Sequence, residues 1–563
     1  MRILGTFAAV FWLVFNHNAC ARTVRYNWKV TAFEAAPDGF TRVVYGINGR
    51  LGHDNPIEVD FGDTIEVLLV NGINEPTCIH WHGMEQRGTP EMDGASGITQ
   101  CSILPGQSTL YRFTPTRPGS FWWHSHDGTQ YVDGLRGPLI VRDTNNRQPW
   151  AALIAREFIV EIDDWYHERS ELLLQQFTDP AQNPNGDEPV WTTVLLNNRG
   201  RFDCSVLSNS SANCITERCL SKFGVVEGQY YLLRVINSAA FAAFDFSIDE
   251  HEFNVVAVDG DYVMPSRPLP VVRLNVGQRY DLLVKADGIT GRKYWMRATS
   301  LFGAPWTSLP LEQFPVGFDP NGLAVVSYDI ETEAGVCCDG VEVIESTDTS
   351  NEQPISELDF IPIHPQRLPE TPDQRMLIQF TMQMTSDGPL GYISINNGSS
   401  NTFKMPTTPT LFEIAGGVPT SSLPASSNAA KLDFGRHVEI VLVNSDVGEH
   451  PFHMHGHSPW VVGSGNMPSA ATSPPELNLH NPLTRDTYTV PGCTADADGN
   501  CQDVGYVALR LNADDAGVWM LHCHIEWHLA TGLAMMFVEG EDILQWHGLE
   551  HISREMQSTC LNV

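Results

Sequence analysis

The stretch GDTIEVLLVN, residues 62–71, returns twice in this chain, as GQYYLLRVIN at 228–237 and as GRHVEIVLVN at 435–444. Each copy opens on a glycine, continues as an alternating or continuous apolar run, and ends on an asparagine nine residues after the glycine. A turn glycine followed by such a run is typical of a β-strand. Together with short valine-rich strands elsewhere, the three copies predict an all-β protein of three homologous domains, each a Greek-key barrel or sandwich.

The domain boundaries follow from changes in composition. Residues 1–21 predict a secretory signal, because Arg2 precedes an apolar run and the small-residue cleavage site Ala19–Ala21. Residues 331–375 hold eleven acidic and two basic residues with several prolines, which is typical of a linker. We therefore expect a first domain at 22–148, a second at 149–330 and a third at 376–563.

Bulk properties bound the location and the partners. No stretch after the signal reaches the roughly 18 unbroken apolar residues of a membrane span, so we expect a secreted, soluble monomer without a membrane anchor. The net charge of −33 argues against nucleic acid and anionic membranes as partners. It fits a cationic or neutral small substrate.

Cysteines and sequons agree with secretion. Of the 12 cysteines, Cys20 leaves with the signal and Cys523 is considered below, so ten remain, an even number as disulfides require. Cys493 and Cys501 flank the turn-rich loop CTADADGNC and are expected to form a bridge. Glycosylation sequons begin at Asn209 and Asn397.

His-x-His pairs occur in two of the three repeats. Nine residues after the repeat asparagine, the first copy has His80 and the third has His453, whereas the second has Phe246. Two further pairs, absent from the middle domain, begin five residues after a glycine at His124 and His522. The four pairs are His80 and His82, His124 and His126, His453 and His455, and His522 and His524. Each pair lies on one strand face, and eight imidazoles exceed the capacity of one metal, so the pattern predicts a three-metal cluster.

A second metal site is predicted on the opposite face. The segment WMLHCHIEWHLATGL, residues 519–533, places Cys523 between two of these histidines, so its thiol points away from both imidazoles. His528 follows the strand, and His450 lies three residues before His453 and faces away from it. One thiolate with two imidazoles is the ligand set of a blue-copper electron-transfer site.

These residue types also occur in less specific settings. Zinc also binds Cys and His, but structural zinc prefers closed four-ligand sets at finger-like spacings, which are missing here. A single histidine is most often satisfied by a backbone carbonyl in the core. We interpret His457 in this way because it lies outside the repeat register.

These motifs resemble the four signature motifs of the multicopper oxidases, and the nearest branch is that of the fungal laccases and ferroxidases. The resemblance spans about residues 25–560. It rests on His80-Trp-His82-Gly, His124-Ser-His126, His450-Pro-Phe-His453-Met-His455, and His522-Cys523-His524 followed by His528. It implies three cupredoxin domains, with a copper cluster between the first and the third.

The resemblance also implies four coppers per chain and the residues that hold them. Type 1 copper is assigned to His450, Cys523 and His528, type 2 to His80 and His453, and the type 3 pair to His82, His124 and His524 on one ion and His126, His455 and His522 on the other. Four coppers match the four electrons that reduce O2 to water, with Cys523 passing each electron through its bonds to His522 and His524. In such proteins Cys101 would bridge Cys560 in the C-terminal tail.

Three further residues match positions near the coppers in this family. Asp93 and Glu526 match carboxylates that donate protons or orient ligands, although either is open to interpretation as a solvated surface acid. Leu533 occupies the axial position where some relatives have methionine, which implies a higher potential or simple packing.

The identity of the reductant is the least determined feature. Glu188 and Asp446 match two acids with which yeast-type ferroxidases bind Fe2+, a hard ion that prefers oxygen ligands. Phe241 stands where some laccases have an acid, and with Phe244 it predicts an apolar pocket for an aromatic ring. We expect a laccase-type oxidase of phenols or polyphenolic pigment precursors, with a ferroxidase as the alternative. A non-catalytic copper store or electron carrier would not require all eleven ligands.

Overall fold

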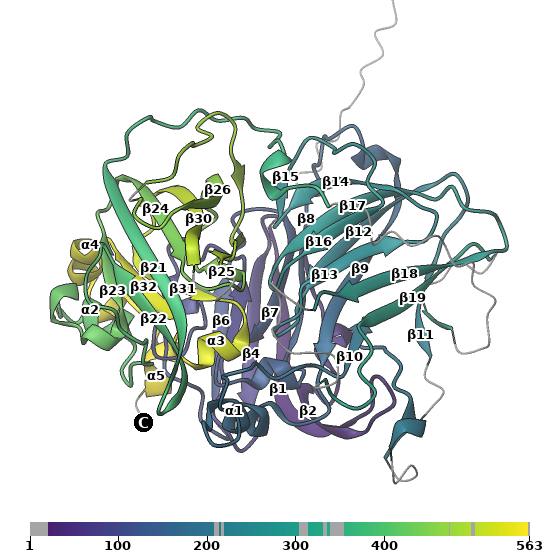
Figure 1. The fold of residues 1–563 in the computed structure, drawn as a ribbon, viewed down its shortest axis with the longest axis horizontal. Coiled ribbons are helices and arrows are strands. Elements are labelled where there is room, and N and C mark those ends of the chain that lie inside the picture. Colours follow the sequence, from purple (N-terminus) through teal and green to yellow (C-terminus); the bar gives the residue numbers. More distant parts are fainter. Residues whose placement is uncertain are drawn as a thin grey trace, which may run out of the picture.

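The strands of this chain form three β-units. The computed structural model describes residues 21–207, 213–215, 219–302, 314–329, 335–337, 354–471, 473–496 and 501–560. Within these residues there are six sheets, and each sheet takes its strands from one chain segment, 23–142, 154–337 or 374–539. Figure 1 shows the third unit in green and yellow on the left, the second in teal on the right, and the first in purple between them. The predicted all-β fold with three cupredoxin-like units is confirmed.

The first unit pairs two four-stranded sheets. One has the order β2 (Arg42–Ile47), β1 (Thr23–Ala35), β4 (Thr64–Asn71), β6 (Ser108–Phe113). The other has the order β3 (Ile57–Asp60), β8 (Arg136–Arg142), β7 (Gly119–Ser125), β5 (Ile79–His82). Val67 of the first sheet and Leu139 of the second are fully buried in one shared core.

The second unit pairs two six-stranded sheets. One has the order β10 (Thr193–Leu196), β9 (Ile154–Trp165), β12 (Tyr230–Asn237), β17 (Arg279–Lys285), β14 (Phe253–Val258), β15 (Asp261–Tyr262). The other has the order β16 (Val271–Leu274), β13 (Phe244–Ile248), β18 (Lys293–Ser300), β19 (Asn321–Ser327), β11 (Leu220–Gly224), β20 (Gly335–Cys337). Strand β20 pairs with β11, so part of the stretch predicted as a linker belongs to this sheet.

The third unit pairs a seven-stranded with a five-stranded sheet. The larger has the order β22 (Gly388–Ile395), β21 (Gln374–Thr385), β24 (His437–Asn444), β30 (Cys501–Asn512), β26 (Trp460–Pro468), β27 (Leu483–Thr484), with β29 (Thr494–Ala495) on β30. The smaller has the order β23 (Ala429–Leu432), β32 (Ala534–Glu539), β31 (Gly517–Cys523), β25 (His450–Met454), β28 (Thr487–Val490).

The repeated sequence occupies the same place in each unit. Its strands β4, β12 and β24 each run parallel to the first strand of their unit and antiparallel to the strand that follows in the sheet. The terminal asparagines Asn71, Asn237 and Asn444 are buried, and each side-chain amide donates to two backbone carbonyls at 2.7–3.1 Å. The asparagine therefore closes the loop after the strand, which gives it a structural reason to recur.

The second unit uses its equivalents of the histidine strands for packing. In the first and third units the histidine strands pair with His80 opposite His124 and His453 opposite His522. The corresponding pair in the second unit, β13 and β18, places Phe246 opposite Ala298, and both side chains are fully buried.

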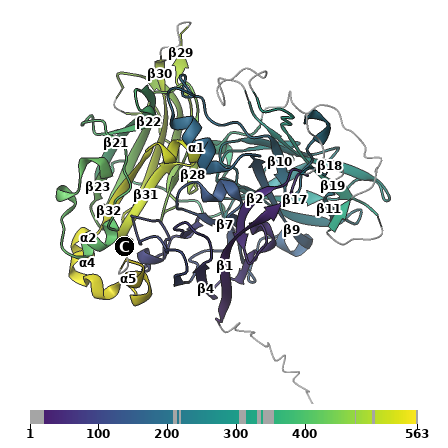
Figure 2. The same ribbon diagram turned by 90° about the horizontal axis from the view of Figure 1, so that it is seen from below.

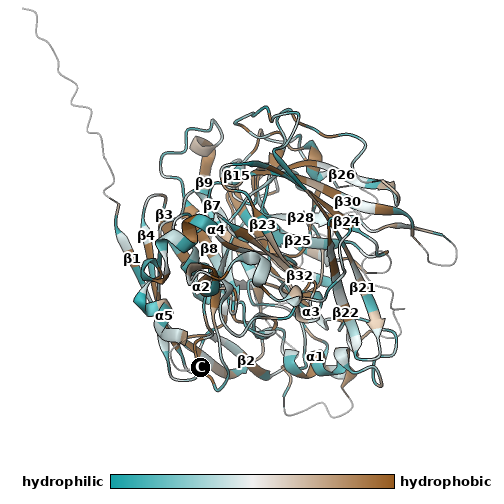
Figure 3. Ribbon diagram, turned by 90° about the vertical axis from the view of Figure 1, so that its left-hand side faces the viewer, coloured by the Kyte–Doolittle hydropathy of each residue, from teal (hydrophilic) through white to brown (hydrophobic). Residues whose placement is uncertain are grey.

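Each unit contacts the other two. Ser120 of the first unit donates to Asp281 of the second at 2.5 Å, and His82 of the first lies 3.2 Å from Asp486 of the third. Arg279 of the second unit also donates to Asp486, at 2.6 Å. Figure 2, which looks from below, shows the three units meeting around a common centre. Figure 3 shows that many of the hydrophobic segments lie on strands.

In the part of the chain that the structure describes, α-helices are few and short. They are α1 (Ser170–Thr178), α2 (Thr410–Ala415), α3 (Glu526–Ala530), α4 (Glu541–His547) and α5 (Arg554–Cys560). Helix α3 follows β31 directly, and α5 packs against β6 of the first unit, where Met556 is fully buried. Among the described residues, no helix is long and apolar enough to cross a membrane.

Disulfides reinforce these contacts. The expected bridges Cys101–Cys560 and Cys493–Cys501 are both present, and a third joins Cys204 to Cys214. The expectation that every cysteine other than Cys523 pairs is wrong for Cys78, whose thiol is free and buried in the core of the first unit.

Some sequence features lie outside the described residues. These are most of the predicted signal, residues 1–20, and the first sequon asparagine, Asn209. Asn397 of the second sequon is exposed in the turn after β22, where its side chain is accessible for glycosylation. The domain boundaries remain predictions.

Candidate functional site

One thiol and two imidazoles meet in the third unit. Cys523 ends β31, His450 begins the neighbouring strand β25, and His528 lies on α3. The Sγ atom of Cys523 is 3.6 Å from Nδ1 of His450 and 3.4 Å from Nδ1 of His528, and all three side chains are buried. The structure therefore brings together the three residues that the alternation of the strand predicts.

The surroundings suit a thiolate ligand. Burial alone raises the pKa of the Cys523 thiol, but the adjacent imidazoles of His528 and His450 outweigh it and lower the pKa to about 7. Leu533 is fully buried. It lies beside this site, because its N–H donates to the carbonyl of His528 and its carbonyl accepts from the N–H of Cys523.

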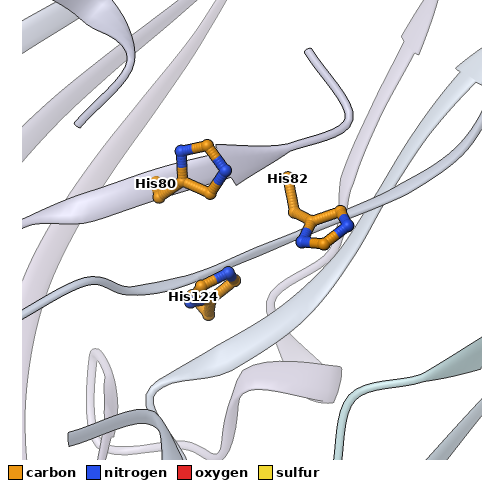
Figure 4. A group of neighbouring side chains, drawn as sticks. All are labelled: His80, His82 and His124. Carbon is orange, nitrogen blue, oxygen red and sulfur yellow. The ribbon is translucent and has the colours of Figure 1, made fainter. Parts of the chain in front are cut away.

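Eight imidazoles converge on the other face of the same strands. They come from β5 and β7 of the first unit and from β25 and β31 of the third, or from the residues just after these strands. Figure 4 shows three of them, His80, His82 and His124, with their rings gathered between two strands. Groups whose ligand atoms lie within 4.8 Å of one another are His80 with His82 and His124, His80 with His453 and His455, and His126 with His455 and His522.

The ring nitrogens point in a direction that suits metal binding. Nδ1 of His80, His124 and His453 donates to a backbone carbonyl at 2.8–3.0 Å. Within the described residues the opposite nitrogen, Nε2, of each of these three is buried without a hydrogen-bond partner. A buried acceptor without a partner is costly unless a cation binds it.

Two other rings give a stronger indication. Nδ1 of His455 donates to Asp93 and Nδ1 of His522 donates to the carbonyl of Cys523. The remaining nitrogens of these two neutral rings are therefore both lone-pair acceptors, yet they lie only 3.2 Å apart. A cation shared between them removes this repulsion, so the donor set fits a metal such as copper.

The carboxylates predicted near the cluster are in place. Asp93 is buried, its Oδ2 accepts from His455 at 2.8 Å, and its Oδ1 lies 3.3 Å from Nδ1 of His80. Glu526 is also buried, and burial raises its pKa to about 8. It lines a cavity of about 360 Å³ together with His124, His126, His522 and His524. Neither acid is a solvated surface residue.

Asp486 and Thr487 were missed by the sequence analysis. Oδ1 of Asp486 lies 3.2 Å from Nε2 of His82, and the hydroxyl of Thr487 lies 3.0 Å from the same nitrogen. The backbone carbonyl of Asp486 accepts from His453. No repeat or spacing in the sequence marks these two residues, because only the packing of the units brings them to His82.

His457 is not among the converging imidazoles. Its ring is buried against Trp519, with Nε2 3.1 Å from a carboxylate oxygen of Glu539. The expectation that it is a core residue satisfied by a backbone carbonyl agrees with this position, because Nδ1 lies 3.2 Å from the carbonyl oxygen of His455.

The predicted substrate residues lie beside the thiolate site. Oε1 of Glu188 accepts from Nε2 of His528 at 2.9 Å, and Oδ2 of Asp446 lies 3.3 Å from Nε2 of His450. The expectation of an open pocket lined by Phe244 is wrong, because this ring is fully buried in the core of the second unit. Phe241 is 7% exposed and packs on Trp191.

Comparison with known proteins agrees with this geometry. Models of the multicopper oxidase family match residues 29–146, 156–309 and 403–542. The iron transport multicopper oxidase fetC of Epichloe festucae is 31% identical over 545 residues, covering 94% of this chain and 78% of that protein. Laccase-2 of Cryptococcus neoformans var. grubii is 32% identical over 548 residues, covering 93% and 86%.

Solved structures show the same fold. The crystal structure of Fet3p, a multicopper oxidase that functions in iron import, superposes with a TM-score of 0.80 at 27% identity, covering 96% of this chain and 95% of Fet3p. The laccase of Botrytis aclada has the same TM-score at 28% identity, covering 96% and 92%. This chain therefore belongs to the multicopper oxidases, copper-binding oxidoreductases that use O2 as electron acceptor.

Proposed function

We propose that this chain is a secreted ferroxidase that holds four coppers and oxidises Fe2+ with O2 as the acceptor. The observation that carries the proposal is a carboxylate at the outer nitrogen of each thiolate-site histidine. Glu188 accepts from His528 and Asp446 approaches His450, and the two carboxylate side chains are 25% and 18% exposed. The histidine side chains themselves are at most 5% exposed, so a donor reaches them through these acids.

The charge state of the two acids suits a hard cation. Burial raises the pKa of Glu188, but the hydrogen bond and charge of His528 outweigh it and lower the pKa below its usual value. The same balance, with His450 as the partner, lowers the pKa of Asp446. Both carboxylates are therefore ionised at neutral pH, and Fe2+ prefers such oxygen ligands.

The ligands are proposed as the family resemblance implies. His450, Cys523 and His528 hold type 1 copper, and His80 and His453 hold type 2. The type 3 pair is held by His82, His124 and His524 on one ion and by His126, His455 and His522 on the other. The ligand atoms of the second set lie within 4.8 Å of one another. Copper bound there supplies one-electron oxidation of the donor and a multi-electron site for O2. The peptide bonds from Cys523 to His522 and His524 connect the two centres.

Two acids are proposed to serve the cluster, Glu526 by passing protons for water formation and Asp93 by orienting ligands. Glu526 lines the cavity that reaches four of the cluster histidines, so it can pass a proton to the O2 side of the cluster. Asp93 lies between His80 and His455 and orients both rings. Three disulfides in the described part of the chain support the secreted location.

Phenol oxidation is the second candidate. It is favoured by the similarity to Laccase-2 and by the aromatic rings of Phe241 and Trp191, whose centroids are 5.8 Å apart. Trp191 follows Glu188 closely in sequence. In this case Glu188 or Asp446 would accept the phenolic proton. The relatives support the iron-oxidising alternative at least as well as the phenol expectation.

The two candidates separate in one experiment. The double variant Glu188→Ala/Asp446→Ala is compared with wild type for kcat/KM toward Fe2+ and toward a bulky phenol, on copper-loaded protein. If both acids bind Fe2+, the iron value falls more than tenfold, since about 1.4 kcal/mol of lost transition-state stabilisation already gives a factor of ten. The phenol value stays within about twofold, a change worth only about 0.4 kcal/mol.

A matched control variant changes the net charge of the protein by the same amount as the test variant. Glu171→Ala/Glu227→Ala removes two exposed acids that contact no proposed ligand, and it leaves both kcat/KM values near wild type. A loss confined to the phenol in the Glu188/Asp446 variant would reject the ferroxidase and support the laccase.

A further inference from the structure

The second unit carries none of the eleven proposed copper ligands, yet one of its loops touches the cluster. Gly277 lies between β16 and β17 with φ +82. A Cβ atom built on Gly277 would stand 3.1 Å from Cε1 of His82 and 3.1 Å from Cδ2 of His524. The backbone of this loop therefore packs directly against two of the proposed ligands, so a side chain at Gly277 would press on both rings and would be strained at this φ.

Arg279, two residues further on, joins all three units. Its guanidinium is fully buried and donates to both carboxylate oxygens of Asp486, each at 2.6 Å. Its other three N–H groups donate to the carbonyls of Ser120, Gly277 and Asp259 at 3.0–3.2 Å. All five donors are satisfied in one geometry, so the position of the Asp486 carboxylate is closely determined.

The Asp486 carboxylate in turn determines how His82 is oriented. Its Oδ1 accepts from Nε2 of His82, assisted by the Thr487 hydroxyl 3.0 Å from the same nitrogen. Nε2 of His82 is thus a donor, and Nδ1 is the nitrogen that points into the cluster, 3.2 Å from Nε2 of His524. His80, His124 and His453 have the opposite arrangement, with Nδ1 as the donor to a carbonyl.

The glycine of the His-Trp-His-Gly motif belongs to the same arrangement. A Cβ atom on Gly83 would stand 2.6 Å from Nη2 of Arg279 and 3.0 Å from Oδ2 of Asp486. The motif thus leaves space for an arginine that lies almost 200 residues away in a unit without ligands. This spacing is a second, independent sign that the guanidinium is part of the site.

We infer that Arg279 is a positioning residue of the three-copper site, through which the second unit sets the orientation of His82. The inference rests on the ligand assignment proposed above. A buried ion pair contributes little net stability compared with apolar packing. Stability alone therefore does not explain why Arg279, Asp486 and Thr487 are all buried here. Their burial is explained if they keep His82 in the tautomer that carries its proton on Nε2.

The test compares Arg279→Met with Arg279→Lys and with the control Arg234→Met. Arg234 is also a buried arginine of the second unit and also contacts Ser120, but its carboxylate partners are Asp281 and Glu157. Each purified variant is loaded with copper and measured for copper content, for the type 1 blue absorption, and for the absorption and paramagnetic resonance of the other three ions.

The expected result is a selective loss. Arg279→Met keeps the type 1 absorption but loses at least half of the type 3 absorption, while Arg279→Lys recovers part of it because the charge returns without the two-pronged geometry. Arg234→Met keeps both signatures. Gly277→Ala, which presses on His82 and His524 without removing a charge, also alters the type 3 signature and spares type 1.

Two outcomes would overturn the inference, and they differ in what else they reject. If Arg279→Met retains four coppers and unchanged type 2 and type 3 signatures, and only its unfolding temperature falls as it does in Arg234→Met, the arginine is merely structural. If wild type itself lacks a type 3 signature, the ligand assignment fails and the inference fails with it.

Discussion

At the scale of single residues, the site depends on the alternation of one strand. His522 lies in the cluster of imidazoles and Cys523 lies with His450 and His528, although one peptide bond separates the two. Successive side chains of a strand point to opposite faces, so neighbouring residues serve different centres. The carbonyl of Cys523 also accepts from Nδ1 of His522, which adds a hydrogen bond to the covalent connection.

This arrangement predicts that the two centres can be disabled separately. Cys523→Ser should abolish both the blue absorption and turnover, because a hydroxyl is a poor replacement for the soft thiolate. His455→Ala should keep the blue absorption, since His455 lies on the opposite face, but it should stop O2 consumption. For each variant, absorption spectroscopy measures the blue band and oxygen uptake measures turnover, both on copper-loaded protein.

One result would contradict the assignment of His455 and Cys523 to opposite faces of the strands. If His455→Ala bleaches the blue absorption as strongly as Cys523→Ser, the two residues serve one centre and the alternation argument is wrong. An active Cys523→Ser variant would reject the proposed type 1 ligand set itself.

At the scale of elements, the repeat is explained by the bonds at the end of its strand. The side-chain amide of Asn237 donates to the backbone carbonyls of Ala242 and Leu274, and its Oδ1 accepts from the backbone N–H of Ala239. The equivalent asparagines of the other two units make the same kind of bonds, so the residue holds a loop common to all three.

We predict that Asn237→Ala destabilises the second unit. It leaves two buried carbonyls without this donor, which costs about 1–3 kcal/mol and lowers the thermal unfolding midpoint. The exposed residue Asn145 provides the control, since Asn145→Ala should change stability by about 0.5 kcal/mol at most. Equal midpoints for Asn237→Ala and wild type would show that the asparagine is not what closes the loop.

Not every element could be predicted. The histidine strands can be recognised from the sequence, because side chains alternate between the two faces of a strand whatever its pairing register with the neighbouring strand. The burial of Phe244 was not, since whether an apolar residue faces a pocket or a core depends on the sheet packed above it. Strand β20 likewise lies in an acidic stretch with the composition of a linker, and only its pairing with β11 makes it a strand.

At the scale of the whole molecule, the net charge of −33 has a consequence for substrates. An acidic protein attracts cations over a distance set by the salt concentration, about 30 Å at 0.01 M and about 10 Å at 0.1 M. We predict that kcat/KM for Fe2+ falls severalfold between these salt concentrations, whereas that for a neutral phenol stays constant. Steady-state oxygen uptake at both salt concentrations measures this, and equal salt dependence of the two substrates would contradict electrostatic steering.

The sequence by itself determined the three repeated units, the eleven proposed ligands and the faces on which they lie. These follow from local geometry, because alternation along a strand and the offsets within a repeat do not depend on how the units pack. The family resemblance indicated Asp93 and Glu526 near the ligands, but only the tertiary structure decided most of the other contacts around them. Asp486 of the third unit contacts His82, Arg279 of the second unit binds Asp486, and Glu188 contacts His528 across 340 residues. Such approaches depend on how whole sheets dock, and no local pattern in the chain records them.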